Sequence, residues 1–311
     1  MTAYSHVSVL REEAVEALQP VDGGVYLDGT FGGGGYSRAI LERAACRLYA
    51  IDRDPDAVAR GGVLSTAYPE KFEIMAGRIC ELDDMLGARR VAALDGAVFD
   101  LGLSSYQIDD PSRGFSFRMD GPLDMRMGCE GRDAATIVNL CPESELADIL
   151  FKYGDEKAAR RVARVIVERR KVKKFATTAD LAGVIRSVVR PDKSGIDPAT
   201  RSFQALRIAV NEELSDIEAA LEQAAALLKP GGRLVVVSFH SLEDRIVKHF
   251  FAEQAGRMPM ASRHDPAGLA PASAPMFRLV QKSPVLPSRA EIHANPRARS
   301  AKLRALERLA A

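Results

Sequence analysis

The chain has 311 residues, of which 47% are hydrophobic and 27% are charged, and its net charge at pH 7 is +1. These values predict a folded protein of one large or two modest domains and exclude a largely disordered chain. The four cysteines form no C-x-x-C pair and the five histidines are scattered, so we expect neither a disulfide framework nor a metal site. With no apolar leader and no run long enough to span a bilayer, we expect a cytoplasmic protein.

The first predicted strand, residues 25–28, leads into a loop with almost no side chains, Asp28-Gly29-Thr30-Phe31-Gly32-Gly33-Gly34-Gly35. A second apolar run, residues 47–52, ends in Asp52, about twenty residues beyond the glycines, where nucleotide-binding α/β folds place an acid on a ribose. Residues 29–38 contain no G-x-G-x-x-G pattern in any register, which disfavours a pyrophosphate. S-adenosylmethionine, which has no pyrophosphate, fits this loop better than NAD or FAD.

Three more strand-like runs follow, at residues 72–75, 97–101 and 233–238. The first four runs are separated by segments long enough for a crossover helix, which predicts a parallel sheet and an α/β fold. The gap before the fifth run is too long for one crossover, and it contains helical patterns at about 143–152, 156–171, 178–190 and 214–228. We therefore predict an inserted helical domain, residues 108–207, in a discontinuous main domain, residues 1–107 and 208–311.

The carboxyl-terminal part of the chain is rich in proline. Residues 257–296 hold seven of the sixteen prolines, which predicts an irregular loop. Residues 277–280 and the run after Pro296 are the candidates for the final pair of strands.

Polar residues cluster just past the end of the fourth strand, where ligands bind in open α/β sheets: Asp100, Ser104, Ser105 and Gln107. The following stretch, Arg113 to Met127, mixes charged, aromatic and methionine residues without helical periodicity. This mixture is unlike a plain linker, and we expect it to line a site.

Residues 160–174 contain eight basic residues against one acid, Glu168. Val162, Val165 and Ile166 give the segment an apolar helical face, so the basic residues could form a merely solvated opposite face. The local concentration of charge favours a phosphate-bearing partner. The candidate phosphate-binding residues are Arg160, Arg161, Arg164, Arg169, Arg170, Lys173 and Lys174.

Six motifs occur in the order seen in the ribosomal RNA small subunit methyltransferase H family, which the chain resembles over nearly its whole length. They are Asp28 to Gly32, Ala50 to Pro55, Asp100 to Ser105, Arg113 to Met127, Phe239 to Arg245 and Asn295 to Ser300. The resemblance implies a Rossmann-like class I S-adenosylmethionine-dependent methyltransferase sheet with an inserted all-helical domain. It further implies methylation of a cytidine N4 in the decoding region of small-subunit ribosomal RNA, with the free RNA or the assembled small subunit as partner.

By position, the resemblance implies these cofactor contacts: Gly34, Gly35, Tyr36, Asp52, Ile79, Asp100 and Gln107. Three residues depart from the family's pattern, since Tyr36 stands where histidine is frequent, Ile79 where phenylalanine is frequent and Tyr106 where proline is frequent. A backbone contact at residue 36 tolerates the change, whereas a side-chain contact does not.

Two hypotheses for Asp100 stay open. Asp100, Ser104 and Ser105 could orient the target amine and accept its proton, or Asp100 could be purely a cofactor ligand. Tyr106, Phe115 and Phe117 are candidates for stacking on the target base. Two other functions also stay open: a methyltransferase for DNA or a small molecule, and a non-catalytic ribosome-assembly protein that binds RNA. The sequence does not decide between a monomer and a homodimer.

Overall fold

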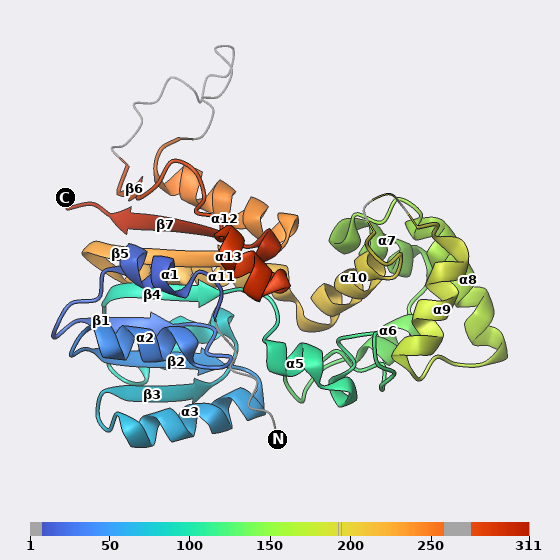
Figure 1. Cartoon of the computed structure of the whole chain (residues 1–311), viewed down its shortest axis with the longest axis horizontal. Helices are drawn as coiled ribbons and strands as arrows, with labels where there is room; N and C mark the ends of the chain where they lie inside the picture. Colours follow the sequence, from blue (N-terminus) through green and yellow to red (C-terminus); the bar gives the residue numbers. More distant parts are fainter. Residues whose placement is uncertain (1–7, 192, 194, 258–274, 311) are drawn as a thin grey trace, which may run out of the picture. The chain divides into compact units, whose positions relative to one another are not determined.

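The computed structural model describes residues 8–191, 193, 195–257 and 275–310, and Figure 1 shows the whole chain as a cartoon. The chain divides into two compact units. The sheet unit consists of Met1–Gly102 and Leu214–Ala311, and the helical unit consists of Leu103–Glu213.

The described strands of the sheet unit form one sheet in the order β3-β2-β1-β4-β5-β7-β6 (Figure 1). Strands β1 to β5 are parallel, and β7 is antiparallel to both β5 and β6. This order and these directions agree with the mainly parallel α/β sheet that the sequence predicts. The strands are β1 Val25–Asp28, β2 Arg47–Asp52, β3 Phe72–Ala76, β4 Leu94–Asp100, β5 Leu228–Ser238, β6 Phe277–Leu279 and β7 Lys302–Arg308.

Helices cover both faces of the sheet because alternate strand residues point to opposite sides. In β2, Leu48 and Ala50 join one buried apolar cluster with residues of α1, α2 and α3, whereas Tyr49 and Ile51 join a second with residues of α4, α11 and α12. The helices of this unit are α1 Arg11–Leu18, α2 Gly35–Arg43, α3 Pro55–Ala67, α4 Leu82–Gly87, α11 Glu213–Leu227, α12 Ser241–Gln254 and α13 Arg289–Ala294, with the 3₁₀ turns η1 Ile79–Glu81 and η4 Pro296–Ser300.

The helical unit has its own buried core. Its elements are α5 Ser105–Asp109, η2 Pro111–Arg113, α6 Ala134–Leu140, α7 Glu143–Gly154, α8 Ala159–Val172, α9 Thr178–Val188 and α10 Thr200–Asn211. Gly154 allows α7 and α10 to approach closely, since a Cβ there would lie 2.6 Å from the Arg201 carbonyl oxygen. No helix within the described residues is long and apolar enough to cross a membrane.

The domain boundaries were predicted after residues 107 and 207. The two units of the structure divide at slightly different places. Leu103 packs against the core of the helical unit, and α10 continues as one helix through residue 207 and contributes Phe203, Leu206 and Ile208 to the buried interior. The boundaries therefore fall after Gly102 and Glu213.

The proline-rich segment is less irregular than predicted. Helix α13 lies inside it, capped by Ser288, whose hydroxyl accepts a hydrogen bond from the Glu291 N–H at 3.1 Å. The Glu291 carboxylate in turn accepts from the Leu10 N–H at 2.7 Å, so the helix has a partner in the amino-terminal part of the sheet unit. Residues 258–274 lie outside the described part of the chain.

Candidate active site

Three acids end three neighbouring parallel strands of the sheet unit: Asp28 on β1, Asp52 on β2 and Asp100 on β4. Strand β1 lies between the other two, and Asp28 is in register with Ala50 and Val98. The carboxyl ends of all three strands thus lie at one sheet edge. The strand order reverses between β1 and β4, and such a switch point is where open α/β sheets bind their ligands.

Asp28 and Asp52 fix the glycine loop that follows β1. Asp28 is buried and accepts hydrogen bonds from the Ser37 hydroxyl at 2.6 Å and the Thr30 N–H at 3.2 Å. Burial raises the pKa of Asp28 to about 6, against the opposing effect of the Ser37 hydrogen bond. The Gly32 N–H donates to Asp52 at 2.7 Å, which ties the loop to β2.

The glycines of this loop are required by close packing. Gly34 has a φ of +76°, and a Cβ there would lie 2.6 Å from the Phe31 ring. A Cβ on Gly35 would lie 2.0 Å from the Ser8 hydroxyl. The loop therefore presents backbone rather than side chains at the start of α2.

Tyr36 belongs to the core of the sheet unit. Its side chain is buried and its hydroxyl donates to the Val9 carbonyl, so burial raises its pKa well above the usual range. Because the side chain is engaged with the amino-terminal segment, only the backbone of this residue is offered to a ligand. The replacement of histidine by tyrosine is compatible with that role.

The Asp52 carboxylate has room for a ligand in addition to its protein partners. Its two oxygens accept from the Gly32 N–H at 2.7 Å and the Asp54 N–H at 2.9 Å, and burial raises its pKa. An ionised carboxylate has about four acceptor positions, so hydroxyl groups of a ribose can still donate to it.

Ile79 lies in η1 and packs, partly buried, against the second apolar cluster. Its neighbours hold the turn on α11: Arg78 pairs with Asp216 at 2.5 and 3.0 Å, and Gln223 Nε2 donates to the Cys80 carbonyl at 2.6 Å. The turn thus presents an aliphatic side chain from a fixed backbone, which fits one wall of an adenine slot.

Asp100 has the least satisfied carboxylate of the three acids. Its backbone N–H donates to the Thr30 hydroxyl at 2.6 Å, but its Oδ1 is buried and has no hydrogen-bond partner among the described residues. Burial raises the pKa of Asp100 well above its usual range, and the charges of Asp28 and Glu243 add to this effect. A buried oxygen without a donor is costly, and a ligand N–H or cationic group would satisfy it.

In the helical unit, Ser104 and Gln107 cap helix α5. The Ser104 hydroxyl accepts from the Gln107 N–H at 3.3 Å, and the Gln107 side-chain oxygen accepts from the Ser104 N–H at 3.1 Å. Ser105 is the first residue of that helix. Gln107 is buried, and its side-chain oxygen is used in this cap.

The three aromatic candidates for base stacking differ in exposure. Phe115 is buried under the Arg113 guanidinium, 5.9 Å from the ring centre. Phe117 packs edge-on against Phe203, with 4.7 Å between ring centres. Tyr106 is 42% exposed, so it alone of the three presents much of its surface to solvent.

Much of the stretch from Arg113 to Met127 serves the core of the helical unit. Met125 is buried in an unusual left-handed conformation, with φ at 64°. Asn211 Nδ2 donates to the Met125 carbonyl at 2.7 Å, and Asn211 Oδ1 accepts from the Met127 N–H at 2.8 Å. These internal bonds hold the end of the stretch in the helical unit, and its role in lining a site stays a prediction.

The basic residues at and after α8 fall into two groups. Arg169 pairs with Asp180 at 2.8 Å, and Arg170 donates to the Val138 carbonyl at 2.8 Å. Arg164 lies 3.8 Å from Glu143 in an exposed pair. Lys171 pairs with Glu168 at 2.7 Å. Four residues are exposed and have no ion pair among the described residues: Arg160, Arg161, Lys173 and Lys174.

Comparison with known proteins adds a decisive observation, because residues 3–309 match the model of the MraW methylase family. The chain belongs to the MraW methylase family. A protein of Acidiphilium cryptum named Ribosomal RNA small subunit methyltransferase H is 65% identical, over 99% of this chain and 98% of its own length. A protein of the same name from Paramagnetospirillum magneticum is 53% identical, over 100% of this chain and 98% of its own length.

The cofactor of this MraW family member is S-adenosylmethionine. The residues at the sheet edge fit this cofactor. Residues 34 and 35 have no side chains, Asp52 retains acceptor positions, Ile79 offers an apolar wall and Asp100 Oδ1 lacks a donor among the described residues. No residue among these is positively charged, which suits a cofactor without phosphates.

Proposed function

We propose that the protein is an S-adenosylmethionine-dependent ribosomal RNA methyltransferase that methylates N4 of a cytidine in the decoding region of the small subunit, in the cytoplasm. The observation that carries the proposal is the unsatisfied Asp100 Oδ1 at the ligand-binding edge of a class I methyltransferase sheet. The names of the relatives support the choice of substrate.

The chemistry places two demands on the protein. The lone pair of the cytosine amine is spread into the ring, so the amine must be aligned with an electrophile and must lose a proton as it reacts. Alignment contributes about 7–11 kcal/mol and a positioned base contributes roughly a hundredfold to ten-thousandfold in rate. When bound, S-adenosylmethionine supplies the activated methyl group.

Asp100 is our candidate for orienting the amine and accepting its proton, with Ser104 and Ser105 as further candidates. Its raised pKa makes the carboxylate, when ionised, a stronger base than an exposed aspartate. In the competing assignment, Asp100 only binds the cofactor. The Thr30 hydroxyl, which accepts from the Asp100 N–H, positions the strand end in either case.

The substitution Asp100→Asn separates these two roles, because it keeps the shape of the side chain and removes its charge. The catalytic role predicts that the single-turnover rate falls at least a hundredfold at saturating cofactor. A loss of cofactor affinity with an unchanged single-turnover rate would reduce Asp100 to a cofactor ligand.

We propose that Gln107 contributes to the cofactor site and that Tyr106 stacks on the extruded cytosine. The exposure of the Tyr106 ring supports this choice over Phe115 and Phe117. Tyr106→Phe keeps the aromatic face and should retain most activity, whereas Tyr106→Ala should weaken RNA binding several-fold. Equal activities of the two variants would exclude stacking by this residue.

We propose that the helical unit is the RNA-recognition domain. The exposed basic side chains at and after α8 supply an RNA-binding surface, and binding to phosphates should weaken as salt is raised. Arg169 and Arg170 are less suitable for mutagenesis than the residues without partners, since their replacement also removes bonds inside the unit.

One assay distinguishes the proposed function from a DNA methyltransferase and from a non-catalytic assembly protein. The protein is incubated with labelled S-adenosylmethionine and, in separate reactions, free small-subunit RNA, assembled small subunits, or DNA. Label in RNA or in subunits supports the proposal and identifies the preferred substrate. Label in DNA alone would indicate a DNA methyltransferase, and RNA binding without any label would indicate a non-catalytic assembly protein.

A further inference from the structure

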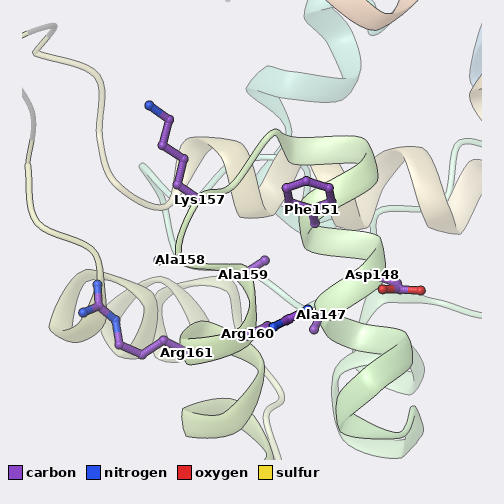
Figure 2. Close-up of a pocket in the computed structure, with 8 residues that line it drawn as sticks. All are labelled: Ala147, Asp148, Phe151, Lys157, Ala158, Ala159, Arg160 and Arg161. Atoms are coloured by element: carbon purple, nitrogen blue, oxygen red, sulfur yellow. The ribbon is translucent and has the colours of Figure 1, made fainter.

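A second candidate site lies within the helical unit and includes two of the basic residues already considered, Arg160 and Arg161. It is a surface pocket of about 670 Å³. Figure 2 shows Phe151 rising from α7 at one flank, Lys157 and Arg161 extending at the other, and Arg160 pointing toward α7. The lining is completed by Ala147, Asp148, Ala158 and Ala159.

Phe151 gives this pocket an open aromatic face. The side chain is 63% exposed, whereas Leu146 and Leu150 of the same helix are fully buried in the core. Phe151 therefore lies off the face that holds α7 in place. The alanines beside it, Ala147 and Ala158, leave space that a flat ring could occupy against the phenyl group.

Three positive charges border this aromatic face: Lys157, Arg160 and Arg161. All three side chains are exposed and none has an ion pair among the described residues. The acid in the lining, Asp148, is paired with Lys152 at 3.3 Å. The pocket therefore has an excess of positive charge.

The fold does not explain why cations stand at this place. Arg160 and Arg161 lie in the first turn of α8, where the helix dipole favours acids and disfavours cations. The first turns of α2, α6 and α10 also lack acids, but only α8 among these four has two adjacent arginines in its first turn. The arginines are thus placed against the electrostatic preference of the helix, which favours a role in binding an anion.

We propose that this pocket binds an unpaired nucleotide of the RNA substrate other than the target cytidine. The base stacks on Phe151, and the adjoining phosphates contact Lys157, Arg160 and Arg161. This inference rests on the proposed function, since it takes RNA as the substrate. A flat apolar face bordered by cations matches the base and phosphate of a single-stranded segment, and base stacking makes the site tolerant of sequence.

The length of α8 separates this pocket from the basic residues that follow the helix. Fourteen residues rise by about 21 Å, so Arg160 and Lys173 lie near opposite ends of a span comparable to several nucleotides. RNA bound at both ends would run along the helix, and a base would be held only at the amino-terminal end.

The test measures the affinity of a decoding-region RNA fragment by fluorescence anisotropy at several salt concentrations. Phe151→Ala should weaken binding about fivefold to a hundredfold, and Phe151→Trp should bind like the unaltered protein. Lys157→Ala, Arg160→Ala and Arg161→Ala should each lower the slope of log affinity against log salt by about one. Arg11→Ala, which removes an exposed arginine paired only with its neighbour Glu12, should leave the slope unchanged.

A fragment that contains 4-thiouridine at single unpaired positions provides an independent readout, since photocrosslinking should attach one such position to the peptide that contains Phe151. Melting temperature and cofactor affinity should be unchanged in Phe151→Ala, because the side chain is exposed. If the unaltered protein methylates RNA while Phe151→Ala and Arg160→Ala bind it equally well, the pocket does not hold a nucleotide. If the unaltered protein neither binds nor methylates any RNA, the proposed function itself is wrong.

Discussion

Replacement of Ser37 by alanine tests the electrostatics of the glycine loop. The Ser37 hydroxyl donates to the buried Asp28 carboxylate at 2.6 Å, and the Thr30 N–H donates to the same carboxylate at 3.2 Å. The substitution leaves a buried charge with one hydrogen bond fewer. It should therefore reduce the free energy of unfolding, and the reduction should depend on pH.

The magnitude follows from the charge state of Asp28. With a pKa of about 6 in the folded protein, Asp28 is mostly ionised at pH 7.5, where a hydrogen bond to a charged group contributes about 1.5–3 kcal/mol. At pH 5 the group is mostly protonated in the folded state, and the bond contributes about 1 kcal/mol. The Ser37→Ala variant should thus lose roughly twice as much stability at pH 7.5 as at pH 5.

The direction of this pH dependence agrees with proton linkage. An acid whose pKa is raised from 3.8 to about 6 contributes most stability below pH 3.8, and this contribution is lost as pH rises through 6. The Ser37 hydrogen bond lowers that pKa, so its removal raises the pKa further and extends the loss to higher pH. The difference in stability between the two proteins therefore grows between pH 5 and pH 7.5.

Urea unfolding at the two pH values measures the effect. Ser65→Ala is a matched control, because the Ser65 hydroxyl donates only to the Gly61 carbonyl of its own helix, at 3.2 Å. This control should change stability by less than about 0.5 kcal/mol at either pH. An equal loss for Ser37→Ala at both pH values would contradict the assigned charge state of Asp28.

Four further variants test other parts of the structure. Asp52→Ala should weaken cofactor binding in a calorimetric titration by at least about tenfold, because it removes a charged hydrogen-bond acceptor; unchanged affinity would remove this residue from the site. Gly34→Ala should lower the melting temperature, since the new Cβ would lie 2.6 Å from the Phe31 ring at a positive φ. Arg169→Ala should destabilise the helical unit, whereas Lys174→Ala should leave stability unchanged and reduce only the salt slope of RNA binding.

The sheet could be predicted because buried parallel strands read as continuous apolar runs. The predicted run 47–52 matches β2. The apolar runs also located the carboxylates at the ends of β1, β2 and β4. The predicted fifth strand, 233–238, is shorter than β5, which begins at Leu228. The Pro230-Gly231-Gly232 sequence at the start of β5 is typical of a turn. This sequence adjoins the register irregularity between β4 and β5.

Helix α10 was missed because its amino terminus carries no start signal. Ala199 occupies the capping position and forms no side-chain cap. The helix follows a segment rich in proline and glycine, and its apolar face becomes evident only when it packs on α7. This omission placed the second domain boundary inside a helix.

The sequence located charged and aromatic residues but could not assign their partners. Arg169 and Arg170 look like the other basic residues of α8, yet their guanidinium groups bond to groups of the helical unit. Phe115 belongs to a distinctive motif and is buried in the core. Conversely, Phe151 reads as an ordinary residue of an amphipathic helix, and only its 63% exposure beside unpaired cations draws attention to it.

Nucleoside analysis of small-subunit RNA tests the central claim most directly. RNA from subunits incubated with the protein and isotopically labelled S-adenosylmethionine is digested in one portion to nucleosides and in another to oligonucleotides, and both digests are analysed by mass. We predict that the label appears in N4-methylcytidine, at a single position in the decoding region, and that Asp100→Asn at saturating cofactor slows its appearance. Label in a different nucleoside, or none in RNA while the protein binds the cofactor, would contradict the account.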